Sequence, residues 1–146
     1  MFIDKIQTKN FYDNYSPCDC DCCKNFILQI EQAYPLLSKF FADNAVDITK
    51  PWELMSVASI DVDKMVDYFD CQYLIFGNCE KDFETEIDGV KIEQTFVHPS
   101  TKNYPQPNFV VSFSISLKNI YNSNYELINE KLKLQKKLRQ SRLKIV

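Results

Sequence analysis

The sequence predicts an α+β domain in which N-terminal helices and a C-terminal helix pack with an antiparallel β-sheet of about four strands. Apolar residues recur at helical spacing between residues 24 and 43, and they alternate with polar residues in two later segments. An Asp88-Gly89 pair between two alternating runs indicates a β-hairpin. Because helical and strand patterns are segregated along the chain, an α+β arrangement is favoured over a parallel α/β sheet.

The length of 146 residues corresponds to about one domain. We assign residues 1–121 to a single α+β domain that includes a cysteine-rich segment at 18–23. Residues 122–146 form a separate basic helix whose end can fray. With eleven Phe and eight Tyr, the chain can build a core without a metal or a disulfide. The two glycines exclude a glycine-rich phosphate loop.

The first strong helical pattern starts at Lys24. It is expected to break at Tyr34, because Pro35 is unfavourable inside a helix but favourable at its first position. A second helix is therefore expected from Pro35 to Asp43, with Asn44 as a left-handed stop. The apolar stripe of this second helix is expected to contain Leu36, Leu37, Phe40 and Phe41.

The second half of the chain predicts four strands. Residues 68–77 are apolar on both faces, which is typical of a central strand. Residues 83–97 predict the hairpin, with Ile87 opposite Val90. Strict alternation over 109–117 predicts a half-buried strand with a serine-rich outer face. One face of the central strand is expected to carry Cys71, Tyr73 and Ile75.

Three segments carry weaker signals. Residues 1–15 predict only a short strand or an ordered arm, and residues 52–60 are compatible with a short helix or an extended segment. Residues 98–107 contain three prolines and predict a loop.

The charge is unevenly distributed. Residues 126–146 carry a formal charge of +5, and the remainder carries −8, which together give the net charge of −3. An acidic body with a basic tail argues against nucleic-acid binding by the chain as a whole. The tail helix could contact an acidic partner or pair with its twin in a homodimer.

The sequence predicts a cytoplasmic protein. The N-terminal residues lack the apolar core of a signal peptide, and no run of about 18 apolar residues indicates a membrane span. In that compartment six cysteines favour free thiols, a metal site or redox chemistry over a disulfide framework.

Four of the six cysteines lie within six residues. Cys20 and Cys23 have the C-x-x-C spacing that places two thiolates on one zinc ion. The candidate metal ligands in the segment are Cys18, Cys20, Cys22 and Cys23. A structural zinc site needs further ligands, and those left in the sheet half of the chain are Cys71, Cys79 and His98. The alternative interpretation is that some of these thiols fill the core as small apolar side chains.

Enzymatic interpretations are less favoured. A C-x-x-C pair that opens a helix resembles a thiol-redox motif, but the chain lacks the surrounding β-α-β pattern. Asp19 and Asp21 are expected to raise the thiol pKa values, which weakens a reactive-thiol interpretation. Cys–His catalysis would have to use His98, the one histidine. We therefore assign no catalytic residue, leave the enzyme question open and favour a non-enzyme.

Residues 18–53 resemble a group of small bacterial cytosolic proteins of low-GC Gram-positive genomes, for which no activity is established. The resemblance is carried by C-x-x-C-x-N-F from Cys20 to Phe26, by Tyr34-Pro35, by Val46-Asp47 and by Lys50-Pro51-x-Glu53. It implies a bacterial origin and no catalytic residues. The group pattern has a glycine before the Val-Asp step, where this chain has Asn44-Ala45.

The sequence thus predicts a non-enzymatic module that binds an unknown protein or small ligand, in one form an immunity- or antitoxin-like protein with an acidic surface. The first alternative is a zinc-binding protein that uses the cysteine-rich segment. The second alternative is a thiol-redox enzyme. No cofactor is required by the sequence, and zinc is the candidate.

Overall fold

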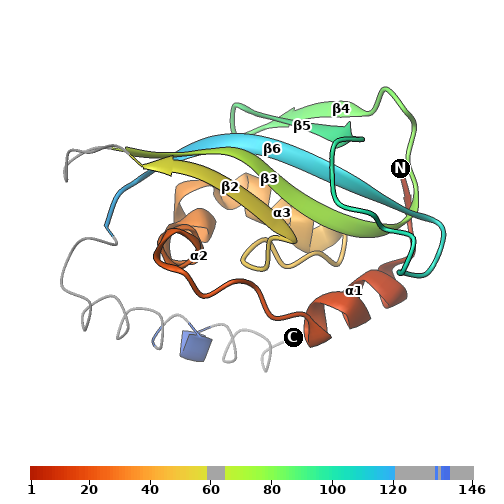
Figure 1. Cartoon of the computed structure of the whole chain (residues 1–146), viewed down its shortest axis with the longest axis horizontal. Coiled ribbons are helices and arrows are strands. Elements are labelled where there is room, and N and C mark those ends of the chain that lie inside the picture. The colour runs from red at the N-terminus through yellow and green to blue at the C-terminus, as the bar shows by residue number, and fades with distance from the viewer. Residues whose placement is uncertain (59–64, 121–133, 135, 139–146) are drawn as a thin grey trace.

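In the described part of the chain, three helices pack on an antiparallel sheet that curls over them (Figure 1). The computed structural model describes residues 1–58, 65–120, 134 and 136–138. In chain order, the elements in these ranges are β1 (Phe2–Ile3), α1 (Lys5–Asn14), α2 (Asp21–Ala33), α3 (Pro35–Asp43), β2 (Glu53–Ala58), β3 (Met65–Asn78), β4 (Glu84–Ile87), β5 (Val90–Thr95) and β6 (Asn108–Lys118).

The sheet has the strand order β1-β3-β6-β5-β4, and β2 also pairs with β3. All of these pairings are antiparallel. The α+β class with an antiparallel sheet is therefore confirmed, but six strands are described instead of about four. The additional strands, β1 and β2, both lie along one edge of β3, where β1 pairs with its last residues and β2 with residues 66–72.

Strand β3 is the central strand that the sequence predicts, and it is buried on both faces. Tyr73 and Ile75 face the helices, where Phe26 and Phe41 are almost completely buried. The opposite face forms a smaller apolar cluster of Trp52, Leu74, Phe76 and Val110. Aromatic residues from α1 and from the proline-rich loop cover this second cluster, which explains how both faces of one strand are shielded from water.

The predicted hairpin is confirmed, with Ile87 opposite Val90. Asp88 and Gly89 both have positive φ angles, 55° and 71°, as a two-residue hairpin turn requires. Asp88 also accepts a hydrogen bond of 2.9 Å from the backbone N–H of Leu37. The turn therefore caps the start of α3 and fixes the hairpin against the helical layer.

Helices α2 and α3 agree with the two helices predicted from the sequence except at three points. Helix α2 begins at Asp21, three residues before the expected Lys24. The prediction that Leu36 belongs to the apolar stripe is wrong, because its side chain is 59% exposed while Leu37 faces the core. Asn44 is not the left-handed residue, since its φ is −103° and Ala45 has a φ of 65°.

Two segments with weak sequence signals have defined structure. The N-terminal segment contains the short strand β1, as one of the two alternatives proposed, but also the helix α1, which the sequence did not predict. Asp4 caps this helix by accepting a hydrogen bond of 3.0 Å from the backbone N–H of Gln7. The segment at 52–60 contains the strand β2, so its extended alternative is correct as far as residue 58.

The predicted C-terminal helix mostly lies outside the described residues. Residues 134 and 136–138 have helical conformation. The homodimer contact proposed for this helix and the division of the chain at residue 121 therefore stay predictions. Within the described ranges, no helix is both long and apolar enough to cross a membrane.

We predict that Gly77→Ala lowers the free energy of unfolding by about 2 kcal/mol or more. Gly77 has a φ of 135°, and a Cβ atom at this position would lie 2.0 Å from the carbonyl oxygen of Phe2 in β1. Chemical denaturation measures the loss. Gly89→Asn is the matched control, because Asn tolerates the left-handed turn and no atom lies within 4 Å of its Cβ position. Equal stability of the two variants would contradict a requirement for glycine beside β1.

Candidate metal site at the start of helix α2

The cysteine-rich segment straddles the first turn of α2. Cys20 is the N-cap residue, and Cys23 is the third residue of the helix. Cys18 lies two residues before the cap, where its Sγ accepts a hydrogen bond of 3.4 Å from the backbone N–H of Cys20. The start of the helix thus determines which thiols share one side of the chain.

The Sγ atoms of Cys18, Cys20 and Cys23 all lie within 4.8 Å of one another. Across the described residues, this is the one group of three or more Cys, His, Asp or Glu side chains that is close enough to hold a metal ion. Cys18 and Cys20 are exposed, and Cys23 is buried. A thiophilic ion could therefore reach the group from solvent and be held against the protein by its innermost thiol.

The spacing of these thiols is close to what zinc requires. Zinc binds thiolates at about 2.3 Å in a tetrahedron, so two ligand sulfurs lie roughly 3.8 Å apart. A maximum separation of 4.8 Å therefore differs from the bound geometry by about 1 Å, which side-chain rotation can supply.

The other candidate ligands lie elsewhere. Cys22 is partly buried and is not in the close group. Cys71 is in the core on β3, and its thiol faces the carbonyl oxygen of Tyr68. Cys79 follows β3, and His98 is in the proline-rich loop with its ring 6.1 Å from that of Trp52. The structure therefore brings together three of the four segment cysteines and none of the distant candidates.

A cavity of about 230 Å³ opens beside the three thiols. Besides the cysteines, it is lined by Tyr15, Pro51, Trp52, Glu53 and Leu54. Glu53 is the first residue of β2 and brings a carboxylate to the cavity. Glu53 lies 30 residues beyond Cys23 in the sequence. It occurs in the Lys50-Pro51-x-Glu53 part of the resemblance described above, but it was not predicted as a ligand, because no metal-ligand spacing connects it to the cysteines.

The three thiols are not equivalent in acidity. Partial burial tends to raise the pKa of Cys20. Hydrogen bonds from the backbone N–H of Cys23 and from the thiols of Cys18 and Cys23 lower this pKa by more, so it lies below the ordinary value of a cysteine. The pKa of Cys23 is raised, mainly by burial and to a smaller extent by the neighbouring thiols of Cys20 and Cys18. The expectation that Asp19 and Asp21 raise the thiol pKa values is therefore wrong for Cys20, because hydrogen-bond donors at the helix start dominate.

A buried polar cluster anchors this turn of α2 to the sheet. The Tyr68 hydroxyl donates a 2.7 Å hydrogen bond to the carbonyl oxygen of Cys22 and accepts one of 3.0 Å from Asn25 Nδ2. Burial raises the pKa of Tyr68, so its hydroxyl stays protonated and able to donate. The cysteine segment is thus fixed by β3, a strand more than 40 residues further along the chain.

Comparison of the chain with protein-family models, with curated proteins and with solved structures gave no match in any of the three. The resemblance to the bacterial group described above therefore stays a prediction.

In metal-free protein, Cys20 should be alkylated with a pH midpoint below that of a free cysteine derivative. A thiol with a lowered pKa keeps its reactive thiolate as the pH falls, whereas Cys23 should react slowly because its pKa is raised. Timed iodoacetamide labelling with peptide mass spectrometry measures each site. Cys79→Ser should leave the fast reaction unchanged and Cys20→Ser should abolish it. A Cys20 midpoint at or above that of the free thiol would contradict the assignment.

Tyr68→Phe should lower the free energy of unfolding by about 2 kcal/mol, because it removes a buried hydroxyl that bonds Asn25 and Cys22. Tyr34→Phe is the matched control, since the Tyr34 hydroxyl makes an exposed contact of 3.4 Å. We expect a loss below about 0.5 kcal/mol for the control. Denaturation curves of both variants measure the difference, and losses of similar size would argue against an anchoring role for Tyr68.

Proposed function

We propose that this protein is a non-enzymatic cytoplasmic binding protein that holds a zinc ion through Cys18, Cys20 and Cys23. The observation that carries the proposal is the convergence of the three thiols within 4.8 Å at the start of α2. Thiolates are soft ligands that select zinc among abundant cellular divalent ions. The backbone N–H of Cys23 favours the charged form of the Cys20 thiol, and metal binding requires that form.

Three thiolates leave one position of a zinc tetrahedron open. All three cysteines border the 230 Å³ cavity, and Glu53 lines the same cavity. Either Glu53 or a solvent molecule can complete the coordination. A site with four protein ligands would be structural, and a solvent-bound position would be open to an external ligand.

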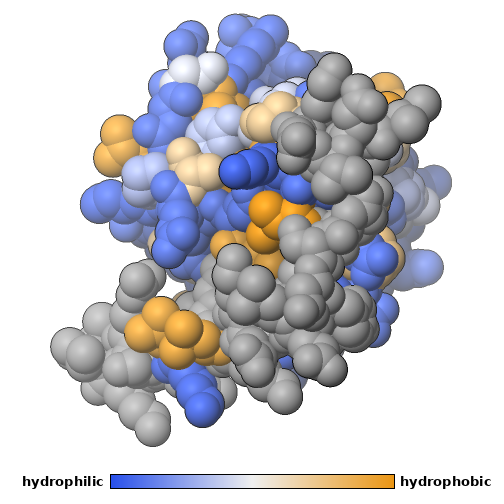
Figure 2. Space-filling view, turned by 90° about the vertical axis from the view of Figure 1, so that its left-hand side faces the viewer, coloured by the Kyte–Doolittle hydropathy of each residue, from blue (hydrophilic) through white to orange (hydrophobic). Residues whose placement is uncertain are grey.

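The ion would hold residues 18–20 against the first turn of α2. Cys20 and Cys23 share a cavity with Glu53 and Leu54 of β2. In β2, Met55 and Val57 are 40% and 61% exposed, and Phe69 on β3 is 51% exposed. Exposed apolar side chains on adjacent strands support an interaction surface for a protein partner. On the side seen in Figure 2, the described surface is mostly hydrophilic and its apolar side chains form separate small patches, which favours a small or partly polar contact.

Thiol-redox activity is the second candidate, and one observation favours it. Cys20 caps a helix of 13 residues while Cys23, three residues on, is buried behind it. In such an arrangement the Cys20 thiolate attacks a substrate disulfide and releases one substrate thiolate. Cys23 then attacks the mixed disulfide, giving a Cys20–Cys23 disulfide and the second substrate thiolate, so that two electrons pass to the substrate.

The zinc proposal predicts about one zinc per chain in protein purified without a histidine tag. Mass spectrometry measures the metal, and a thiol count before and after chelation measures protection. Cys18→Ser, Cys20→Ser and Cys23→Ser should each weaken zinc binding strongly, because each removes one of three thiolates. Replacement of zinc by cobalt should give a thiolate charge-transfer band that weakens in each variant.

Cys79→Ser is the matched control, since Cys79 lies outside the close group, and it should retain zinc. Cys22→Ser tests the fourth segment cysteine and should also retain zinc. Glu53→Gln should weaken binding only if the carboxylate is a ligand. Metal-free protein whose Cys20 and Cys23 cycle with a disulfide substrate would instead establish the redox candidate. Protein with neither zinc affinity nor disulfide exchange would refute both.

A further inference from the structure

Strand β6 has an open edge on the side of the β4–β5 hairpin. Strand β5 pairs with β6 only at residues 110–112, where the pairing ends with Glu93 opposite Ser112. Strand β6 continues to Lys118, and Figure 1 shows it extending beyond the hairpin turn. On its other side, β6 pairs with β3 as far as Lys118. Within the described part of the chain, residues 113–118 therefore have a strand partner on one side only.

Alternate residues of β6 direct their backbone groups toward this open edge. In an antiparallel sheet, the N–H and C=O groups of successive residues point to opposite neighbours. The carbonyl oxygens of Ser116 and Lys118 accept hydrogen bonds from side chains of the helical layer, from the Tyr34 hydroxyl at 3.4 Å and from Gln29 Nε2 at 2.6 Å. These two side chains occupy the place of a further strand. By the same alternation, the N–H and C=O groups of Ser114 face the open edge.

A cavity of about 570 Å³ lies along this edge. One wall is β6 from Ser114 to Ser116, and the opposite wall is the hairpin turn from Asp88 to Val90. Phe69 of β3, which is 51% exposed, also lines the cavity. A strand edge beside an exposed apolar ring provides both features that bind an extended peptide, main-chain hydrogen bonds and a contact for one side chain.

The hairpin is held away from β6 by its contact with the helical layer. Asp88 in the turn accepts the 2.9 Å hydrogen bond from the backbone N–H of Leu37, at the start of α3. Val90, the first residue after the turn, is 6% exposed and belongs to the core. Both walls of the cavity are therefore fixed before any ligand binds, which lowers the entropic cost of binding.

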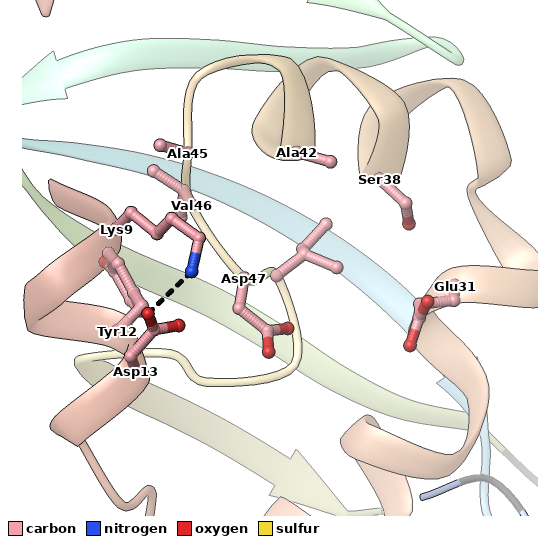
Figure 3. Close-up of a pocket in the computed structure, with 10 residues that line it drawn as sticks. Lys9, Tyr12, Asp13, Glu31, Ser38, Ala42, Ala45, Val46 and Asp47 are labelled. Carbon is pink, nitrogen blue, oxygen red and sulfur yellow. Dashed lines mark hydrogen bonds and ion pairs between the residues drawn. The ribbon is translucent and has the colours of Figure 1, made fainter. Parts of the chain in front are cut away.

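The cavity among the helices, shown in Figure 3, has a different lining. It is bordered by α1, α2, α3 and the segment that follows α3, and several of its polar side chains bond within the protein. Lys9 pairs with Asp13 at 2.6 Å, and Asp47 accepts hydrogen bonds from the backbone N–H and the hydroxyl of Thr49. At the edge of β6, by contrast, the groups that face the cavity are backbone groups repeated at the spacing of a strand. Such a row is complementary to another extended backbone.

We propose that the open edge of β6 binds an extended peptide segment of a partner protein, which adds a strand beside residues 113–116. The peptide backbone pairs with the N–H and C=O groups of Ser114, and a peptide N–H replaces the 3.4 Å contact of Tyr34 with Ser116. An apolar side chain of the peptide packs against Phe69. The bond from Gln29 to Lys118 marks the end of the docking edge.

The proposal requires no charge on the peptide. Asp67 and Asp88 line the cavity, but each carboxylate already accepts a hydrogen bond, Asp67 from the Ser116 hydroxyl and Asp88 from Leu37. The inference goes beyond the zinc proposal and does not depend on a metal ion, because this cavity shares no lining residue with the cavity at the thiols.

The probe is a capped peptide, acetyl-Lys-Thr-Val-Thr-Val-Thr-Lys-amide, whose alternation places both valines on one face. It is titrated into full-length ¹⁵N-labelled protein and followed by amide chemical shifts. The amides of residues 113–116 and 88–90 should shift, and the Ser114 amide should become protected from hydrogen exchange. Absence of binding up to about 5 mM peptide would overturn the proposal.

Two N-methylated forms of the peptide separate strand pairing from other contacts. One form is methylated at the two valines and the other at the two threonines that follow them, so each lacks N–H groups on one edge of the peptide strand. With the valines facing Phe69, only one peptide edge pairs with β6. One form should therefore bind at least about tenfold more weakly and the other should bind like the parent peptide. Equal affinities of the two forms would contradict pairing with a strand edge.

Paired variants of the protein test the two contacts. Ser114→Pro removes the N–H that faces the open edge and should abolish binding, whereas Ser114→Ala keeps this N–H and should bind within about twofold of the parent protein. Phe69→Ala should weaken binding about fivefold or more. Phe96→Ala, at an exposed phenylalanine outside the cavity, should not. The amide spectrum of each unliganded variant shows whether its fold is retained, and the N-methylated peptides decide the question if Ser114→Pro does not fold.

Shifts centred on β1 or β2 instead of β6 would overturn the proposal, as would unchanged binding by Phe69→Ala. Sedimentation of the protein alone tests a second copy as the occupant. A dimer in which the amides of residues 113–116 are protected would replace the partner peptide and also overturn the proposal. The same titration after chelation, and with Cys20→Ser, should give an unchanged affinity, which separates failure of this proposal from failure of the zinc proposal.

Discussion

The position of α2, and with it the cysteine site, depends on the buried hydroxyl of Tyr68. This hydroxyl bonds Asn25 and the carbonyl oxygen of Cys22 in the first turns of α2. Asn25 Oδ1 in turn accepts a 2.9 Å hydrogen bond from the backbone N–H of Ile120, just after β6. One polar cluster thus joins the helix to two central strands. Because an unpaired polar group at this depth costs free energy, the cluster selects a single position for the helix.

A bulge in β3 makes this contact available. The register between β3 and β6 shifts between Tyr68 and Cys71, so that both residues face the core although three positions separate them. Strict alternation would direct them to opposite faces. The Ser114 hydroxyl donates a 2.6 Å hydrogen bond to the carbonyl oxygen of Phe69, which satisfies the backbone at the bulge. The irregular strand and the anchored helix are therefore two parts of one arrangement.

The sequence predicted the elements whose burial is apolar and periodic. Strand β6 alternates clearly, β3 is apolar on both faces, and the Asp-Gly turn specifies its own hairpin. Helix α1 gave no such signal, because its aromatic contacts with the sheet come from two adjacent residues, Phe11 and Tyr12, and the rest of its attachment to β3 is by hydrogen bonds. Its buried residues are Thr8, which accepts a hydrogen bond from the backbone N–H of Phe76, and Tyr12. Ile6, which an apolar pattern would place inside, is 87% exposed. A helix held by hydrogen bonds to a distant strand cannot be found from hydrophobic periodicity.

For the candidate site, the sequence identified the segment but not which thiols converge. Four cysteines in six residues contain several pairs that fit a metal, and the choice depends on where α2 begins. With Cys20 as the cap, Cys23 lies nearly one helical turn on and returns to the same side, while Cys22 is rotated away. Burial tends to raise the pKa of Cys20, but the backbone N–H of Cys23 and the neighbouring thiols lower it by more, so the pKa falls although Asp19 and Asp21 were expected to raise it. Glu53 reaches the same cavity only because β2 pairs with β3, a long-range contact that no local pattern encodes. Three chemically identical thiols thus differ in burial, and Cys20 and Cys23 differ in pKa, because they occupy different positions at the start of the helix. A ligand of the site would therefore meet thiols of unequal acidity and accessibility.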